Sequence, residues 1–313
     1  MAQPYHINDT TSYHRDHLDT LGWELTVCNA LEGAENPCRG IIHNPASFGE
    51  LLIDFLAGLI PMEQLRHFIE IGGGYGYVMR DLLARYPDTR ASMLDLSPLL
   101  LERQRTTLAG MPVQFYHDDF FYYDSNFYAG FDLVLMNEII GDFATACDVD
   151  PAVIYAVTPA CSDPTLSNIR RIVSTYGFAL PKEPFNFNIG AIQAVEKLCS
   201  SRVRFAYLSE HSCEASVQDD LKEILQVSGP GNPERIPLRG HDEYTIKFSY
   251  LEQVARSFGY RTARGQYKEF IAPVRSGKLN FILTSNSQKD EHEIIRQFVE
   301  DLYKYEYLVL MRD

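Results

Sequence analysis

The sequence predicts an α/β fold in three layers, with a mostly parallel sheet between two layers of helices. Short apolar segments that end in an acidic or amide residue alternate with segments of helical periodicity. The first of these strands is followed by a turn that is dense in glycine. Because open sheets of this kind bind ligands at the carboxyl ends of their strands, the residues at those ends are the first candidates for a site.

The first predicted strand covers residues 66–71 and places Glu70 near its end. Gly72, Gly73, Gly74 and Gly76 follow, and glycines let a backbone adopt conformations that a Cβ forbids and let a ligand approach closely. Residues 77–85 then repeat apolar side chains at helical spacing. A dinucleotide fingerprint G-x-G-x-x-G would need a third glycine where Tyr77 stands, which argues against a nicotinamide oxidoreductase.

Three further strands are predicted at residues 90–95, 113–116 and 131–136. Asp95 ends the first of them, about 20 residues past the glycine turn, where such folds bind ribose hydroxyls. Ser97 and Pro98 then form a typical helix start. Asp118, Asp119 and Phe120 follow the next strand, and Asn137 and Glu138 follow the last one.

This ordered set, with Glu-x-Gly-x-Gly-x-Gly at its start, resembles the cofactor site of class I S-adenosylmethionine (SAM)-dependent methyltransferases. The resemblance implies a Rossmann-like seven-stranded sheet whose last strand is antiparallel. It also implies that SAM is the cofactor, with the glycine turn around its methionine half and an acid after the third strand paired with adenine. Asp119 is the preferred acid and Asp118 the alternative. The implied cofactor residues are Glu70, Gly72, Gly73, Gly74, Gly76, Asp95, Leu96, Asp118, Asp119, Phe120 and Asn137.

Four regions are expected along the chain. Residues 1–60 form an N-terminal helical cap, where Ser47 and Glu50 make a capping-box pattern, and this cap either covers the active site or mediates dimerisation. Residues 61–138 form the SAM-binding half of the core. Residues 139–189, between strands 4 and 5, form an insertion that is either a substrate lid or an elaborated surface loop. Residues 190–313 complete the core.

The last region contains several predicted elements. A helix at residues 190–199 leads to the fifth strand at 202–208. Ser249 and Glu252 suggest a capped helix, and residues 262–271 and 279–284 are predicted to form a terminal hairpin. Residues 291–310 are predicted to form an amphipathic closing helix that docks on the core or contacts a partner.

Composition limits the possible partners. A net charge of −14 argues against a nucleic-acid partner, because phosphate contacts need clustered lysine and arginine. The six cysteines, Cys161 among them, lack C-x-x-C spacing and are expected to be reduced thiols of a cytoplasmic protein. No signal peptide or membrane span is expected. His14 and His17 are expected on a solvated helix face, so no metal site is predicted.

Two residues are candidates for catalysis, Glu138 after the fourth strand and His211 just beyond the fifth. A phenol or carboxylic acid acceptor needs one base, often a histidine, although His211 could equally satisfy only a loop. A guanidinium acceptor needs two carboxylates, which Glu138 with Asp142 or Glu210 could supply. A weaker resemblance to the MidA-like group rests on Asn137-Glu138 and on residues 240–249, and that group contains arginine methyltransferases.

The sequence therefore predicts a SAM-dependent methyltransferase that acts on an O or N nucleophile. The acceptor is a small metabolite or a protein side chain, and the chain could be a homodimer. The alternative is a non-catalytic protein of the same fold that serves as an assembly or scaffold partner.

Overall fold

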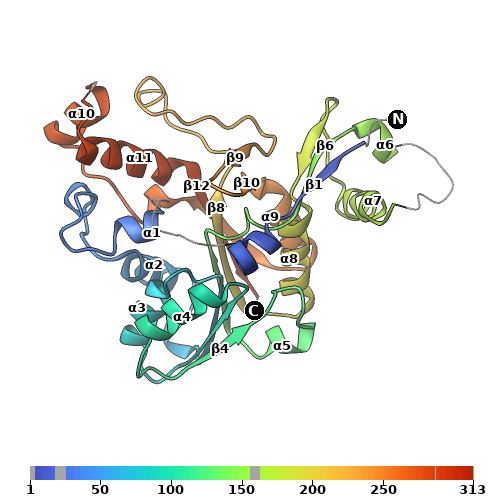
Figure 1. Cartoon of the computed structure of the whole chain (residues 1–313), viewed down its shortest axis with the longest axis horizontal. Coiled ribbons are helices and arrows are strands. Elements are labelled where there is room, and N and C mark those ends of the chain that lie inside the picture. Colours follow the sequence, from blue (N-terminus) through green and yellow to red (C-terminus); the bar gives the residue numbers. More distant parts are fainter. Residues whose placement is uncertain (1–3, 18–25, 156–162, 286, 313) are drawn as a thin grey trace.

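The computed structural model describes residues 4–17, 26–155, 163–285 and 287–312 (Figure 1). Cys161 lies outside these ranges, and the other five cysteines are free thiols. Among the described residues, no helix combines the length and the apolar character that crossing a membrane requires.

A seven-stranded sheet forms the centre of the molecule, in the order β11-β12-β8-β5-β2-β3-β4. β12 is antiparallel to both of its neighbours, and the other pairs are parallel. The predicted fold class is therefore confirmed. The strands are β2 (His67–Ile71), β3 (Arg90–Asp95), β4 (Val113–His117), β5 (Leu133–Asn137), β8 (Phe205–His211), β11 (Arg261–Gln266) and β12 (Tyr305–Met311).

Helices cover both faces of this sheet and bury two apolar clusters against it (Figure 1). One cluster includes side chains of α2 (Phe48–Ala57), α3 (Tyr77–Arg85), α10 (Gly277–Thr284) and α11 (Asp290–Lys304). The other includes side chains of α5 (Ser125–Ala129), α7 (Pro164–Tyr176), α8 (Ile189–Ser200) and α9 (Phe248–Ser257). The predicted capping box is present at the start of α2, and Ser47 accepts a hydrogen bond from the Glu50 backbone N–H.

Two small sheets and several short helices complete the fold. β1 (His6–Asn8), β6 (Thr145–Val149) and β7 (Phe185–Phe187) form a three-stranded sheet, so the N-terminal segment is paired with the region between β5 and β8. β9 (Arg235–Pro237) and β10 (Asp242–Tyr244) form a two-stranded sheet. The remaining elements are η1 (Tyr13–His17), α1 (Val27–Ala30), η2 (Arg39–Ile41), η3 (Met62–Gln64), α4 (Pro98–Thr107), α6 (Pro151–Tyr155) and η4 (Tyr267–Glu269).

The C-terminal elements differ from the prediction. Residues 279–284 belong to helix α10, which Ser276 caps by accepting a hydrogen bond from the Leu279 backbone N–H, so the predicted strand there is wrong. The closing helix ends at Lys304, and the fully buried run from Tyr305 to Met311 forms β12. β12 lies between β8 and β11 and supplies the antiparallel strand. A run that is buried on both faces suits a central strand better than one side of a surface helix.

Two further boundaries differ from the prediction. Helix α9 begins at Phe248, and the Ser249 hydroxyl donates a hydrogen bond to Glu214 at 2.6 Å, so the predicted capping box at Ser249 is wrong. β8 begins at Phe205 and extends to His211, about three residues later than predicted. His211 is therefore the last residue of this strand and pairs with Tyr305.

The strand register brings the predicted site residues to one edge of the sheet. Ile71 is opposite Leu94, Asp95 is opposite His117, and Asn137 is opposite Ser209. The carboxyl ends of β2, β3, β4 and β5 therefore lie side by side, as a ligand site in this kind of fold requires.

Candidate functional site

A cavity of about 370 Å³ opens at this edge of the sheet. Ten of the predicted cofactor residues line it, and so does Glu138. Other lining residues come from the N-terminal part (residues 9–11, 14, 26, 28 and 29), from residues 142–144 and from α8 (Gly190 and Gln193). The cavity is therefore bounded by the core, the N-terminal segment and the region that follows β5.

The glycine turn forms one wall of the cavity because its backbone conformations suit glycine. Gly72 and Gly74 have φ values of 61° and 52°, in the left-handed region that favours glycine. A Cβ on Gly72 would lie 1.8 Å from Ile139 Cδ1, whereas a Cβ on Gly74 would meet no heavy atom within 4 Å. The space beside Gly74 is thus open for a ligand.

Glu70 is buried beneath this turn, and burial raises the pKa of its carboxyl to about 8. A hydrogen bond from the Met79 backbone opposes this increase, and the nearby Asp95 and Asp81 add to it. Glu70 Oε2 has no hydrogen-bond partner among the described residues. A buried acid with an unpaired oxygen beside a cavity is suited to a cationic ligand or a hydrogen-bond donor.

Asp95 is buried at the end of β3 and is held by two hydrogen bonds. Its Oδ1 accepts from the Ser97 backbone N–H at 2.9 Å, and its Oδ2 accepts from Gln104 Nε2 at 2.8 Å. Gln104 Nε2 also donates to the Gly74 carbonyl at 3.1 Å. Burial raises the pKa of Asp95 to about 6, and the two hydrogen bonds oppose this increase. Gln104 thereby fixes the acid relative to the glycine turn.

The segment after β4 presents a second acidic and aromatic wall. Asp118 Oδ1 accepts from the Asp119 backbone N–H at 2.9 Å, and Asp119 Oδ1 accepts from that of Phe121 at 2.7 Å. The Phe120 ring is buried and stacks on Phe143, with centroids 5.8 Å apart. Both acids line the cavity, so the geometry leaves open which of them is the better match to the predicted adenine partner.

Asn137 is the last residue of β5, and Glu138 follows it directly. Asn137 Oδ1 accepts hydrogen bonds at 3.0 Å from both the Ser209 and the Tyr267 hydroxyl. Glu138 has a φ of 54°, which is uncommon for a residue with a side chain. Burial, followed by the charge of Asp301, raises the pKa of Glu138 to about 8, and its Oε2 has no hydrogen-bond partner among the described residues. Glu138 Oε1 accepts from Asn137 Nδ2 at 3.4 Å, and the unpaired Oε2 together with the positive φ suggests a functional role.

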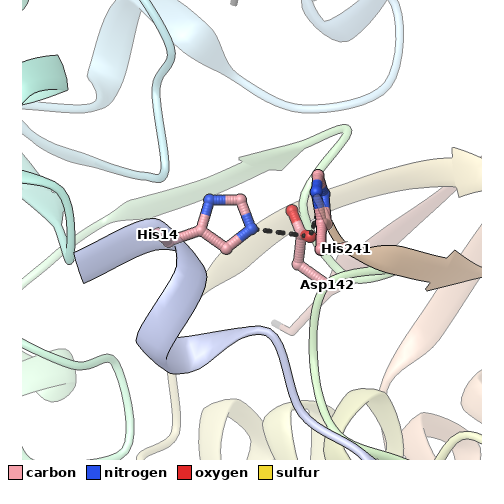
Figure 2. Close-up of side chains that lie close together, drawn as sticks. All are labelled: His14, Asp142 and His241. Atoms are coloured by element: carbon pink, nitrogen blue, oxygen red, sulfur yellow. Dashed lines mark hydrogen bonds and ion pairs between the residues drawn. The ribbon is translucent and has the colours of Figure 1, made fainter. Parts of the chain in front are cut away.

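A cluster that the sequence did not predict lies at the edge of the cavity (Figure 2). His14 of η1 and Asp142 line the cavity, and His14 Nε2 is 2.8 Å from Asp142 Oδ1. His241, from the turn before β10, points to the same carboxylate, with its Nε2 3.6 Å from Asp142 Oδ1. Burial alone would lower the pKa of His14, but the Asp142 carboxylate raises it above its ordinary value.

Two predicted site residues lie outside the cavity wall. Gly76 has a φ of 82° and is the N-cap residue of α3, so it links the glycine turn to the helix without lining the cavity. His211 packs on the Tyr305 ring and faces Glu210 and Asp301, at 3.8 Å and 3.7 Å. Its position in β8 directs it to these neighbours, so the structure does not bring His211 to the site.

The cavity wall is strongly acidic. Its side chains include seven carboxyl groups and one histidine, and no lysine or arginine is among the described residues that line it. The acidic residues are Asp9, Glu70, Asp95, Asp118, Asp119, Glu138 and Asp142. This arrangement favours a cation and disfavours ligands that carry phosphate groups.

Comparisons with known proteins agree with this geometry. Residues 48–157, about a third of the chain, match the family model of an O-methyltransferase domain. No curated protein matches the sequence. A crystal structure of an uncharacterized protein from Burkholderia thailandensis is similar to the chain, with a TM-score of 0.50 and 14% identity over 85% of this chain and 79% of that one.

Two other structures resemble the chain more weakly. One is a likely methyl transferase from Burkholderia thailandensis with bound S-adenosyl-homocysteine (SAH), with a TM-score of 0.48 and 13% identity over 85% of this chain and 76% of that one. The other is the plantazolicin methyltransferase BpumL in complex with SAH, with a TM-score of 0.46 and 10% identity over 97% and 94% of the two chains.

Three predictions are confirmed: the class I methyltransferase fold, methyltransferase activity, and SAM as the cofactor. The evidence is the family-model match together with the seven-stranded sheet and its antiparallel strand. The methyl acceptor is not identified by these comparisons.

Proposed function

We propose that this class I SAM-dependent methyltransferase transfers the methyl group to an oxygen atom of a small-molecule acceptor. The observation that carries the proposal is the acidic cavity beside the glycine turn. SAM brings a sulfonium and an ammonium group into this cavity, and the surrounding carboxyl groups stabilise both. The pyrophosphate of a nicotinamide cofactor would meet the same acids and be repelled.

The predicted cofactor residues have distinct roles in this proposal. Gly72, Gly73 and Gly74 contact the methionine part of SAM, and Glu70 lies beneath it. Asp95 and Leu96 contact the ribose. The segment after β4 contacts the adenine through Asp118 or Asp119 and through the Phe120 backbone and ring. Asn137 faces the centre of the ligand, and Gly76 supports the turn without contact.

Glu138 is the proposed general base. In the reaction the acceptor oxygen attacks the methyl carbon in line with the C–S bond. The new C–O bond forms as the C–S bond breaks, and the electron pair of the C–S bond stays on sulfur, which becomes neutral. The hydroxyl proton passes to the Glu138 carboxylate. A base with a pKa near the working pH is well suited to this transfer, and the Glu138 pKa of about 8 meets this condition.

An oxygen acceptor is favoured by the family model, which describes an O-methyltransferase domain. A small molecule is favoured by the enclosure of the cavity, because residues 9–14 lie against the loop after β5. The Thr10 hydroxyl donates to the Asp142 carbonyl at 2.8 Å, and Asn8 Nδ2 donates to the Asp242 carbonyl at 2.8 Å. A folded protein substrate would have to displace this segment, which we call the N-terminal strap (residues 4–17).

We also propose roles for the four regions of the chain. Residues 1–60 act as the cap, 61–138 as the SAM-binding half, 139–189 as a substrate lid and 190–313 as the second half of the core. The lid residues Phe143 and Ala144 line the cavity, and β6 of the lid pairs with β1 of the strap. The strap and the lid would therefore move together when acceptor enters.

The test is methyl transfer from radiolabelled SAM to a cell extract that has been separated into small-molecule and protein fractions. We expect label in the small-molecule fraction, and its loss with the Glu138→Gln variant. Titration calorimetry with SAH should show micromolar binding to both proteins. Label confined to the protein fraction would contradict a small-molecule acceptor. Amino acid analysis of the labelled protein would then test whether arginine carries the methyl group. If SAH does not bind and neither fraction is labelled, the proposal that the chain is a SAM-dependent methyltransferase is contradicted.

A further inference from the structure

We propose that His14, Asp142 and His241 bind a divalent first-row transition-metal ion at the edge of the cofactor cavity. The sequence predicts no metal site, because His14 and His17 are expected on a solvated face. In the structure, three segments that are far apart in the chain bring two imidazoles and one carboxylate together (Figure 2).

The distances suit a common ligand set. One nitrogen of each histidine and one oxygen of Asp142 lie within 4.8 Å of one another. The separations from Asp142 Oδ1 are 2.8 Å to His14 Nε2 and 3.6 Å to His241 Nε2. Ligands that are each about 2.1 Å from one ion stand roughly 3.0 to 3.4 Å apart in octahedral or tetrahedral geometry. Small side-chain adjustments would therefore place all three around one ion.

The chemistry of the donors indicates the class of ion. Imidazole nitrogen with carboxylate oxygen is the donor set of zinc, iron, cobalt and manganese sites, whereas calcium and magnesium take oxygen ligands. The Glu243 carboxylate adds a second negative charge, with its Oε1 3.5 Å from His241 Nε2. A divalent cation would balance both carboxylates.

His241 provides an independent indication. Its side chain is only 5% exposed, yet neither ring nitrogen has a hydrogen-bond partner among the described residues. His241 Nε2 is close to the carboxylates of Asp142 and Glu243 but too far from either for a hydrogen bond, and a buried polar group without a hydrogen bond costs about 1–3 kcal/mol. Coordination through Nε2 would satisfy the nitrogen that points to Asp142.

The surroundings hold the three side chains in place. The Tyr13 ring stacks on His241 with centroids 4.1 Å apart, and the Tyr13 hydroxyl donates to the Arg239 carbonyl. Gly240 has a φ of 97°, and a Cβ there would lie 2.7 Å from Tyr13 Cε2, so only glycine permits this approach. Supporting contacts of this kind orient ligands in known metal sites.

The position suggests what the ion does, and this step rests on the proposed function. His14 and Asp142 line the cofactor cavity, so an ion that they bind would lie at the edge of the space where the proposed acceptor enters. A bound ion would accept an electron pair from the acceptor hydroxyl and lower its pKa, and the released proton passes to Glu138 or to solvent. The substrate class is then a hydroxyl compound whose oxygen binds the metal.

The test is metal binding to the full chain after treatment with a chelator. Titration calorimetry with ZnCl₂, MnCl₂ and CoCl₂ should show one ion per chain, and Co²⁺ should give a visible absorption spectrum typical of nitrogen and oxygen ligands. His14→Ala, Asp142→Asn and His241→Ala should each weaken binding by at least about 100-fold. His17→Ala is the matched control, because His17 is exposed in the same element as His14, and it should bind as the unaltered chain does.

Binding that is equal in the His17 and His241 variants would overturn the proposal, and so would the absence of binding by the unaltered chain. Asp142→Asn keeps the shape of the side chain, and circular dichroism would identify any variant that fails to fold. SAH titration of the chelator-treated protein separates the two proposals. SAH binding without metal binding would reject only the metal site, whereas metal binding without SAH binding would reject only the proposed function.

Discussion

Gly74 and Gly110 share a left-handed backbone and differ in what lies beside them. In both, a Cβ would meet no heavy atom within 4 Å, but only Gly74 lines the cavity. We expect Gly74→Val to weaken SAH binding by at least about 100-fold, because the side chain fills the ligand's space and the strained φ shifts the turn. Gly110→Val carries a similar strain and should keep SAH affinity in calorimetry. Equal SAH affinities of the two variants would contradict the assignment of the glycine turn as part of the cofactor site.

Glu138 is expected to act in the reaction and to contribute little to SAH binding. Glu138→Gln keeps the shape of the side chain and removes the proton acceptor, so kcat/KM should fall by about 100- to 10,000-fold while the SAH dissociation constant changes little. Glu210→Gln is the control. Glu210 is also buried, but its oxygens already accept from the Gly141 and His211 backbone N–H groups. Similar losses in both variants would indicate a general effect of removing a buried acid.

Local sequence patterns were sufficient for some site residues and insufficient for others. Glu70, Gly74 and Asp95 each follow or end a short apolar run, and that position alone placed them at the sheet edge. His14 and Asp142 carry no such local signal, since His14 comes from a strap that pairs with a strand more than 100 residues away. A three-residue shift in β8 explains why His211 was expected near the cavity and is found against Tyr305.

Helix α4 is expected to control cofactor affinity through one side chain. Gln104 is fully buried on this helix and donates to both Asp95 and the Gly74 carbonyl, while its Oε1 has no partner among the described residues. Gln104→Leu removes a donor from two acceptors, so it should lower the melting temperature by a few degrees and weaken SAH binding by about tenfold. Gln114→Leu, at an exposed position of β4, should alter neither quantity. A large drop in melting temperature with unchanged affinity would show that the two hydrogen bonds serve only the fold.

The first half of the fold was predictable at the level of elements, and the C-terminal part was predictable only in part. The strands before Glu138 alternate with helices, and apolar periodicity identified α3 while the Ser97 cap identified α4; the short helix α5 was not predicted. Apolar side chains at helical spacing run from Ile294 to Leu302, whereas residues 305–311 form a nearly continuous apolar run whose period does not distinguish helix from strand. The change to β12 at Tyr305 depends on the gap between β8 and β11. That gap exists only in the assembled sheet, which a local pattern cannot reveal.

At the scale of the whole molecule, the acidic cavity is expected to make stability depend on pH. Glu70 and Glu138 have folded-state pKa values of about 8, above their ordinary value of 4.5. The folded state therefore holds protons that the unfolded state releases, and the stabilising contribution of these two groups is lost as the pH rises from about 5 to about 8. The melting temperature of the ligand-free chain should decrease over this range. Glu70→Gln should flatten the decrease, and an unchanged slope would show that Glu70 does not titrate in this way.

SAM should reverse this trend, because its positive charges stabilise the ionised carboxylates. Binding then shifts the pKa of Glu70 and Glu138 downward and releases protons, so SAM affinity should increase from pH 6 to pH 8.5. SAH lacks the sulfonium charge and should show a weaker increase. Calorimetry in buffers of different ionisation enthalpy measures the released protons directly. If SAM and SAH release the same number, the cavity does not distinguish the sulfonium by charge, and another feature of the cofactor must account for its recognition.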